Sequence, residues 1–129
     1  MNRSGRARDE RGSATLQLVV LLPLLFTALF VGVQAAVWYQ ARTMAYAAAQ
    51  VGATAAAAEN ASAGDGIAAA SRFAQAKGGD VLAGSTVNGR RTATTVTVSV
   101  RGTALSVIPG MRFRVNQSVS APVERITGP

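Results

Sequence analysis

The sequence contains no cysteine and no histidine. Without cysteine the chain cannot form a disulfide or a thiolate metal site, and without histidine it lacks the usual base at neutral pH. Its six acidic residues are scattered apart from the adjacent Asp9 and Glu10. No short helical spacing therefore holds two carboxylates on one face, as paired-carboxylate catalysis would need. These absences argue against an enzyme, a metal site and a bound cofactor.

Acidic residues are also few relative to basic ones, because 13 Lys and Arg stand against 6 Asp and Glu and give a net charge of +7. A basic chain can bind nucleic acid through counterion release. Here the basic residues are spread thinly along the chain, are not interleaved with aromatics and form no recognisable nucleic-acid module. We therefore expect a basic surface that serves solubility and contact with anionic headgroups or wall polymers, and not with nucleic acid.

Charged side chains are absent from the whole stretch between Gly12 and Ala41. Inside it, Leu16 to Trp38 would form a helix about 35 Å long, against roughly 30 Å of bilayer hydrocarbon. Fourteen of these 23 residues are Leu, Val or Phe, which outweigh the cost of inserting Gln17 and Gln34. Both glutamines lie near the ends of the stretch, where that cost is smallest. The sequence therefore predicts a transmembrane helix over residues 16–38.

The charges that flank this span predict its orientation. The head, Met1 to Arg11, carries four arginines, whereas only Arg42 lies close to the other end. Positive charge favours the cytoplasmic side of a membrane. We therefore expect a single-pass protein with a cytoplasmic N-terminus and an extracytoplasmic C-terminal domain.

Two features inside the span bear on how the helix packs. Pro23 lacks an N–H and crowds the carbonyl of Val19, which predicts a kink or a loosened turn, although membrane helices also simply tolerate proline. Ala28, Gly32 and Ala36 follow at intervals of four. They form a stripe of small residues along which another helix could approach closely, although abundant alanine gives such spacing by chance.

The helical pattern continues beyond the span, because the segment up to Glu59 is dominated by alanine, the best helix former. We therefore predict one continuous helix over residues 13–59. An alanine face repeats at intervals of four outside the membrane. Its members are Ala41, Ala45, Ala49, Ala53 and Ala57. Such a face buries little area per residue, so we expect a second helix or a sheet to pack against it.

Residues 60–129 have the pattern of a small outer domain. Ser62 and Asp65 have the spacing of a capping box for a second helix that extends to about Lys77 and ends at Gly78-Gly79. A short strand over residues 80–86 and a turn at Asn88-Gly89 are expected to follow.

Two amphipathic strands complete the pattern. Valines alternate with polar residues over 95–101, and apolar residues alternate with polar ones from Met111 to Val119. A turn at Pro109-Gly110 separates them. The sequence therefore predicts an α+β fold with a long N-terminal helix, a short second helix and an antiparallel sheet of two to four strands.

The junction between the charged head and the apolar run reads Arg11-Gly12-Ser13, followed by an uncharged stretch with Pro23 eleven positions after the glycine. It resembles the type IV pilin-like leader, and more closely the TadE/TadG-like minor pilins, or pseudopilins, of tight-adherence (Flp-type) pili. The resemblance implies that a membrane prepilin peptidase removes residues 1–12, with Gly12 before the cut, Ser13 as the new N-terminus and Pro23 as the helix proline. It also implies a subunit that packs on other pilins through its N-terminal helix and takes part in pilus assembly or in the pilus tip.

One position departs from the family pattern. The family usually has glutamate five positions after the glycine, where this chain has Gln17. A glutamine can donate and accept hydrogen bonds but cannot form an ion pair with the free amine of a neighbouring subunit. We therefore expect a subunit that joins the filament where no such pairing is needed, or one that stays outside the filament.

Two other interpretations of the apolar run remain open. A secretory signal peptide could be cut after Val33-Gln34-Ala35, where the residues satisfy the small-residue rule, although the apolar stretch is longer than such segments usually are. Alternatively, the chain is a bitopic membrane protein with a small extracytoplasmic binding domain and no processing at Gly12. The three interpretations differ in the N-terminus of the mature protein.

Overall fold

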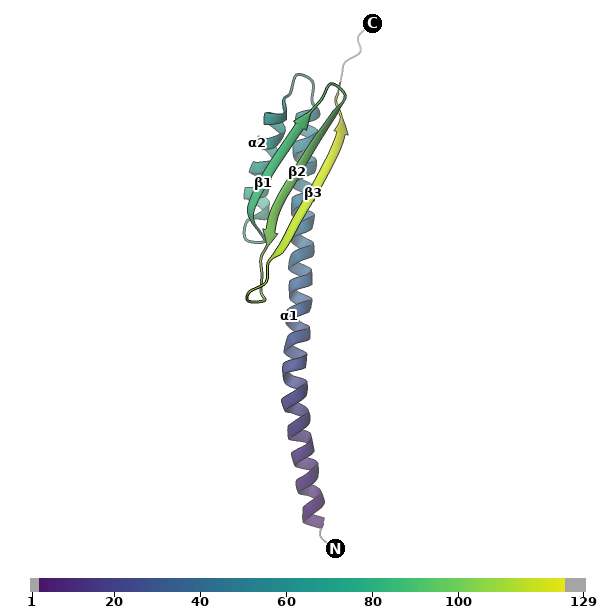
Figure 1. Ribbon diagram of the computed structural model, residues 1–129, viewed down its shortest axis with the longest axis vertical. Coiled ribbons are helices and arrows are strands. Elements are labelled where there is room, and N and C mark those ends of the chain that lie inside the picture. The colour runs from purple at the N-terminus through teal and green to yellow at the C-terminus, as the bar shows by residue number, and fades with distance from the viewer. Residues whose placement is uncertain (1–2, 125–129) are drawn as a thin grey trace. The chain divides into compact units, whose positions relative to one another are not determined.

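The computed structural model describes residues 3–124, with the side chains of residues 10–124. It consists of two helices, a short π-helix and three strands (Figure 1). Their bounds are α1 Arg3–Ala57, α2 Ala63–Phe73, η1 Ala74–Gly78, β1 Leu82–Arg91, β2 Thr95–Ala104 and β3 Phe113–Pro122. This order confirms the predicted α+β fold. The chain divides into two compact units, Met1–Val33 and Gln34–Pro129.

The described part of the first unit is entirely helical and belongs to α1, which begins at Arg3, inside the predicted leader. The helix continues without a break through Pro23. The hydroxyl of Thr27 donates a hydrogen bond to the carbonyl of Pro23 at 2.7 Å. Proline removes only one N–H from the helical ladder, so the rest of the turn can remain helical. A kink at Pro23 therefore stays a prediction.

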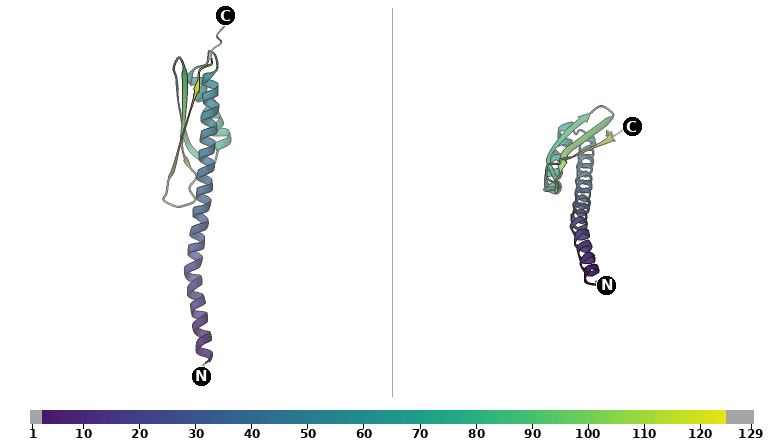
Figure 2. Two further views of the ribbon diagram at one scale, coloured as in Figure 1. Left: turned by 90° about the vertical axis from the view of Figure 1, so that its right-hand side faces the viewer. Right: turned by 60° about the horizontal axis from the view of Figure 1, so that its bottom comes forward.

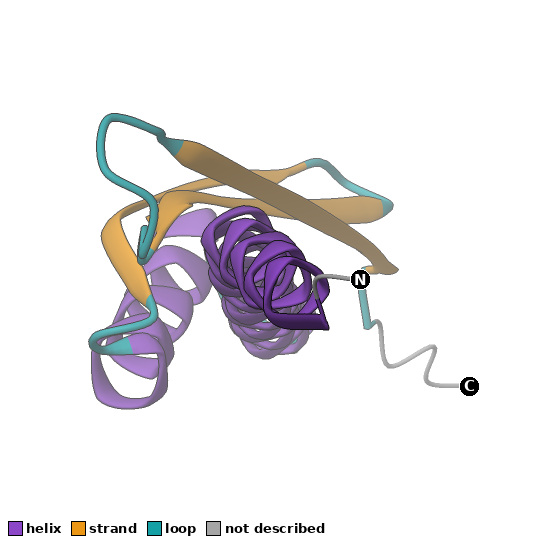
Figure 3. Cartoon of the chain, turned by 90° about the horizontal axis from the view of Figure 1, so that it is seen from below, coloured by secondary structure: helices purple, strands orange, loops and turns teal. Residues whose placement is uncertain are grey.

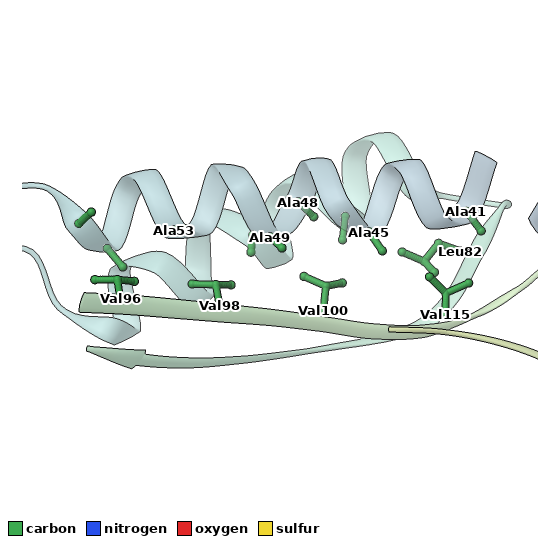
Figure 4. Packing of buried hydrophobic residues seen from close by; sticks show 14 of the residues in the cluster. Ala41, Ala45, Ala48, Ala49, Ala53, Leu82, Val96, Val98, Val100 and Val115 are labelled. Atoms are coloured by element: carbon green, nitrogen blue, oxygen red, sulfur yellow. The ribbon is translucent and has the colours of Figure 1, made fainter. Parts of the chain in front are cut away.

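The second unit is built around the contact between the alanine face of α1 and β2 (Figure 4). Val96, Val98 and Val100 of β2 are completely buried, and small alanine side chains let the strand come close to the helix backbone. The five predicted alanines of α1 are all at most 3% exposed. A sheet is thus the partner that this face required, and Figure 3 shows the sheet lying across one side of α1 and α2.

The three strands form an antiparallel sheet in the order β1-β2-β3 (Figure 2). The prediction of a turn at Asn88-Gly89 is wrong, because both residues lie within β1 and pair with Ser99 and Val98. The chain reverses instead after Thr92, whose N–H donates to the carbonyl of Thr95 at 2.8 Å.

Helix packing explains why glycine occupies position 89. A β-carbon at Gly89 would lie 2.9 Å from Cγ1 of Ile67 in α2 and 3.3 Å from the carbonyl oxygen of Ala63. Real β-carbons essentially never approach a neighbour so closely, so this glycine permits the close approach of α2 to the strand. The Asn-Gly pair is therefore a packing feature of a ten-residue strand, and β1 extends well beyond the predicted 80–86.

The second helix begins at the predicted cap and ends as an α-helix at Phe73, before the predicted end near Lys77. The hydroxyl of Ser62 accepts a hydrogen bond from the N–H of Asp65 at 3.2 Å, and the carboxylate of Asp65 accepts one from the N–H of Ser62 at 2.8 Å. This reciprocal pair is a capping box, which satisfies two N–H groups at the start of α2. The π-helix η1 then carries the helical path on to Gly78. The chain leaves the helix at Gly79, as the glycine pair predicted.

Candidate functional site

The N-terminal unit presents an apolar surface formed by α1. Its large hydrophobic side chains from Leu16 to Val33 are between 43% and 68% exposed. Among the described residues, one helix is long and apolar enough to cross a membrane, and none of its most apolar window is buried. Soluble monomers rarely expose apolar patches this large, which usually contact lipid or another protein. The helix is therefore suited to single-pass membrane anchoring.

The residues of the predicted processing site lie on the same helix. Gly12 and Ser13 are both exposed, and a β-carbon at Gly12 would meet no atom within 4 Å. The fold of the chain thus places no steric requirement on glycine at this position. Processing at Gly12 remains a prediction.

The other residues singled out in the span are also exposed. Gln17 is exposed, and so are the three small residues Ala28, Gly32 and Ala36. A β-carbon at Gly32 would meet no atom within 4 Å. The small-residue stripe is thus available to another helix, and its use as a packing surface remains a prediction.

Gln34 has a role that the sequence did not reveal. It is only 2% exposed, and its side chain is hydrogen-bonded to the start of the loop between β2 and β3. Its Nε2 donates to the carbonyl of Leu105 at 3.1 Å, and its Oε1 accepts from the N–H of Val107 at 2.7 Å. An amide inside an apolar run needs hydrogen-bond partners. An amide in an apolar run therefore indicates that Gln34 has a hydrogen-bond partner, but the sequence alone does not identify that partner.

The aromatic pair at the C-terminal end of the predicted span, Trp38 and Tyr39, is split between two environments. Tyr39 is 67% exposed and suits the interfacial position expected of tyrosine. Trp38 instead packs partly against the buried cluster. The guanidinium carbon of Arg42 lies 5.5 Å from the centroid of the Trp38 ring, within the range of a cation–π interaction.

The face of the sheet that points away from α1 is polar and basic. Hydroxyl pairs bridge β2 and β3 on this face, with Thr97 and Ser120 at 3.0 Å and Ser99 and Ser118 at 3.1 Å. The register also places arginines on this face, with no acidic residue beside them on the described strands. These arginines are Arg90, Arg101 and Arg114. The described residues contain no group of three or more acidic, histidine or cysteine side chains that could hold a metal ion.

Residues 12–54 match the family model described as TadE-like protein. Over this segment the chain is similar to the TadE-like family. The match begins at Gly12, the residue predicted to precede the cut, and ends within α1. It confirms the resemblance drawn from the sequence and supports a pilus-associated protein. The matched TadE-like segment leaves out α2 and the sheet, and no curated protein and no solved structure matches the chain.

Proposed function

We propose that this protein is a membrane-anchored, TadE-like minor pilin or pseudopilin, cut after Gly12 by a prepilin peptidase. The observation that carries the proposal is the position of the family match, which begins at Gly12 and covers the apolar helix. The exposure of the whole apolar surface of that helix also supports it. In this proposal the protein is not an enzyme, and its partners are the membrane, the peptidase and other pilin subunits.

The charged leader affects whether the apolar helix can leave a bilayer. A helix with a free N-terminus inside the cell can leave lengthwise if its apolar surface passes from lipid to neighbouring helices. The small residues Ala28, Gly32 and Ala36 help such packing because they let backbones approach closely. A leader that carries four arginines opposes this transfer, since charge in the bilayer is costly. Removal of residues 1–12 would turn a membrane anchor into a subunit able to join an assembly.

The signal-peptide interpretation conflicts with the role of Gln34. A cut after Ala35 would remove Gln34 from the domain to whose β2–β3 loop it is hydrogen-bonded. The carbonyl of Leu105 and the N–H of Val107 would lose the hydrogen bonds that they make with its side chain. Buried polar groups without partners are costly. The folded C-terminal unit thus favours a mature chain that retains Gln34.

Intact mass of the protein extracted from membranes of its native host tests the proposal. We expect a mature chain that starts at Ser13. A chain that starts at Met1 or Asn2, in cells with an active prepilin peptidase, would contradict processing. A start at Ala36 would establish the secreted form.

A matched pair of variants identifies the residue that the peptidase requires. Gly12→Val should leave the leader attached, because the peptidase needs the small residue before the cut, while the fold has room for the added side chain. Gly32→Val is the control, since it changes a glycine on the same helix with equal room around it and away from the cut. Loss of processing in both variants would mean that the change in the helix, and not the cleavage site, is responsible.

The second candidate is an unprocessed bitopic protein whose outer domain binds an acidic ligand. The basic outward face of the sheet favours it, because Arg90, Arg101 and Arg114 share that face without a neighbouring acid on the described strands. The same mass measurement separates the two candidates, since only this one keeps residues 1–12 in cells with an active peptidase.

A further inference from the structure

The loop between β2 and β3, residues 105–112, exposes apolar side chains. Leu105 is 47% exposed and Met111 is 51% exposed. Val107 and Ile108 are half-buried, and the loop turns at Pro109-Gly110. A water-facing hairpin loop normally carries polar residues, so this composition calls for an apolar neighbour.

Gln34 fixes the place of this loop beside α1. Its two hydrogen bonds, to Leu105 and Val107, hold the start of the loop against the helix at position 34. Position 34 precedes Trp38, the predicted outer end of the span, by about 6 Å of helix. The loop is thus attached to α1 close to the predicted outer end of the span.

The backbone of the loop is also suited to an apolar environment. The carbonyl of Leu105 and the N–H of Val107 are paired with Gln34. The carbonyl of Ile108 accepts from the hydroxyl of Ser106 at 2.7 Å and from the N–H of Met111 at 3.4 Å. Backbone groups that enter lipid must find partners within the protein, because hydrocarbon offers none. These bonds reduce the cost of moving the loop out of water.

We propose that the loop 105–112 inserts its apolar side chains into the headgroup and acyl boundary of the membrane that holds α1. The proposal rests on the membrane anchoring proposed above. Arg112 follows Met111 and is exposed, so its cation can contact anionic headgroups while the apolar residues enter the boundary. In this proposal the protein touches the membrane at two places, the span and the loop.

Site-specific fluorescence in vesicles tests the proposal, and the absence of cysteine makes single labelling clean. The full chain is reconstituted into vesicles of phosphatidylcholine and phosphatidylglycerol that carry a nitroxide near the head of the acyl chain. Three variants each carry an environment-sensitive label, on Met111→Cys in the loop, Leu22→Cys in the span and Thr94→Cys in the turn between β1 and β2. We expect the nitroxide to quench the labels at positions 22 and 111 and to spare the label at position 94.

The three labels separate the two proposals. One outcome would overturn the loop proposal and leave the anchoring intact. In it, the nitroxide quenches the label at position 22, but it quenches the label at position 111 no more than the label at position 94. Absence of quenching at position 22 would overturn the anchoring itself. A label at position 111 with blue-shifted emission but no nitroxide quenching would show that protein, not lipid, covers the loop, which also overturns the proposal.

Discussion

Gly52 of α1 and Gly66 of α2 face each other where the two helices meet. A β-carbon at Gly66 would lie 2.6 Å from the carbonyl oxygen of Gly52, and one at Gly52 would lie 2.8 Å from the carbonyl oxygen of Gly66. Both carbonyl oxygens belong to the helix backbone, which cannot move aside as the end of a flexible side chain could. The pair therefore sets how closely α2 docks on α1, and through α2 it positions β1.

Gly66→Ala should destabilise the C-terminal unit by about 1–3 kcal/mol, because the added methyl forces the helices apart. Urea unfolding of the detergent-solubilised protein, followed by circular dichroism, measures the change. Gly64→Ala is the matched control on the same helix, since its nearest contact would be an ordinary 3.5 Å. The control should gain up to about 1 kcal/mol from the better helix propensity of alanine. Equal effects of the two changes would contradict a tight crossing at Gly66.

Asn88→Thr should change the free energy of unfolding by less than about 0.5 kcal/mol, because position 88 is an exposed strand site. A tight hairpin turn there would require a positive φ and would lose stability with a β-branched residue. Gly110→Thr is the comparison, since Gly110 lies in the loop turn with φ of 79°. Thermal unfolding should show a clear loss for Gly110→Thr alone. A similar loss of stability for Asn88→Thr would show that Asn88-Gly89 forms a tight turn.

Gln34→Leu should cost about 1–3 kcal/mol, because it leaves the carbonyl of Leu105 and the N–H of Val107 without their partner. Amide hydrogen exchange gives a more specific signal, as the Val107 amide should lose protection while β2 keeps its own. Gln40→Leu serves as the control, because Gln40 is exposed on the same helix. Unchanged protection at Val107 in the Gln34 variant would show that this contact does not hold the loop.

Gln17→Glu should leave co-purification with the major pilin unchanged, because the proposed subunit joins the filament at a place where no carboxylate is needed at this position. The measurement is the ratio of this protein to the major pilin in sheared pilus preparations from the native host. A large rise in that ratio would show that the missing ion pair normally limits entry of the subunit into the filament.

The local elements could largely be predicted from residue patterns. The apolar run, the capping box at Ser62 and Asp65 and the alternating valines each have a periodicity or spacing that one kind of structure satisfies. The prediction of a turn at Asn88-Gly89 is wrong because the same residue pair suits both a tight turn and a close packing site. Only the position of Ile67 in α2 decides between them, and that position depends on the folded helix pair.

The features of the candidate site also divide into those that the sequence predicts and those that only the folded structure shows. The apolar helix could be identified from the sequence, because hydropathy acts along the chain and needs no neighbours, whereas Gly12 as a processing site stays a prediction. The role of Gln34 could not be identified, since its partners in the loop lie 71 and 73 residues away. A lone amide in an apolar run shows that a partner is needed but not which one.

The sequence by itself determined the apolar run, the capped start of α2 and the alternation of the strands, because these follow from side-chain hydropathy and backbone preference at each position. Tertiary structure alone decided that the sheet covers the alanine face, that Gly52 and Gly66 meet and that Gln34 holds the loop. Those relations depend on surfaces brought together from distant segments, and the free energy of such contacts is set by shape and hydrogen-bond geometry in the folded chain.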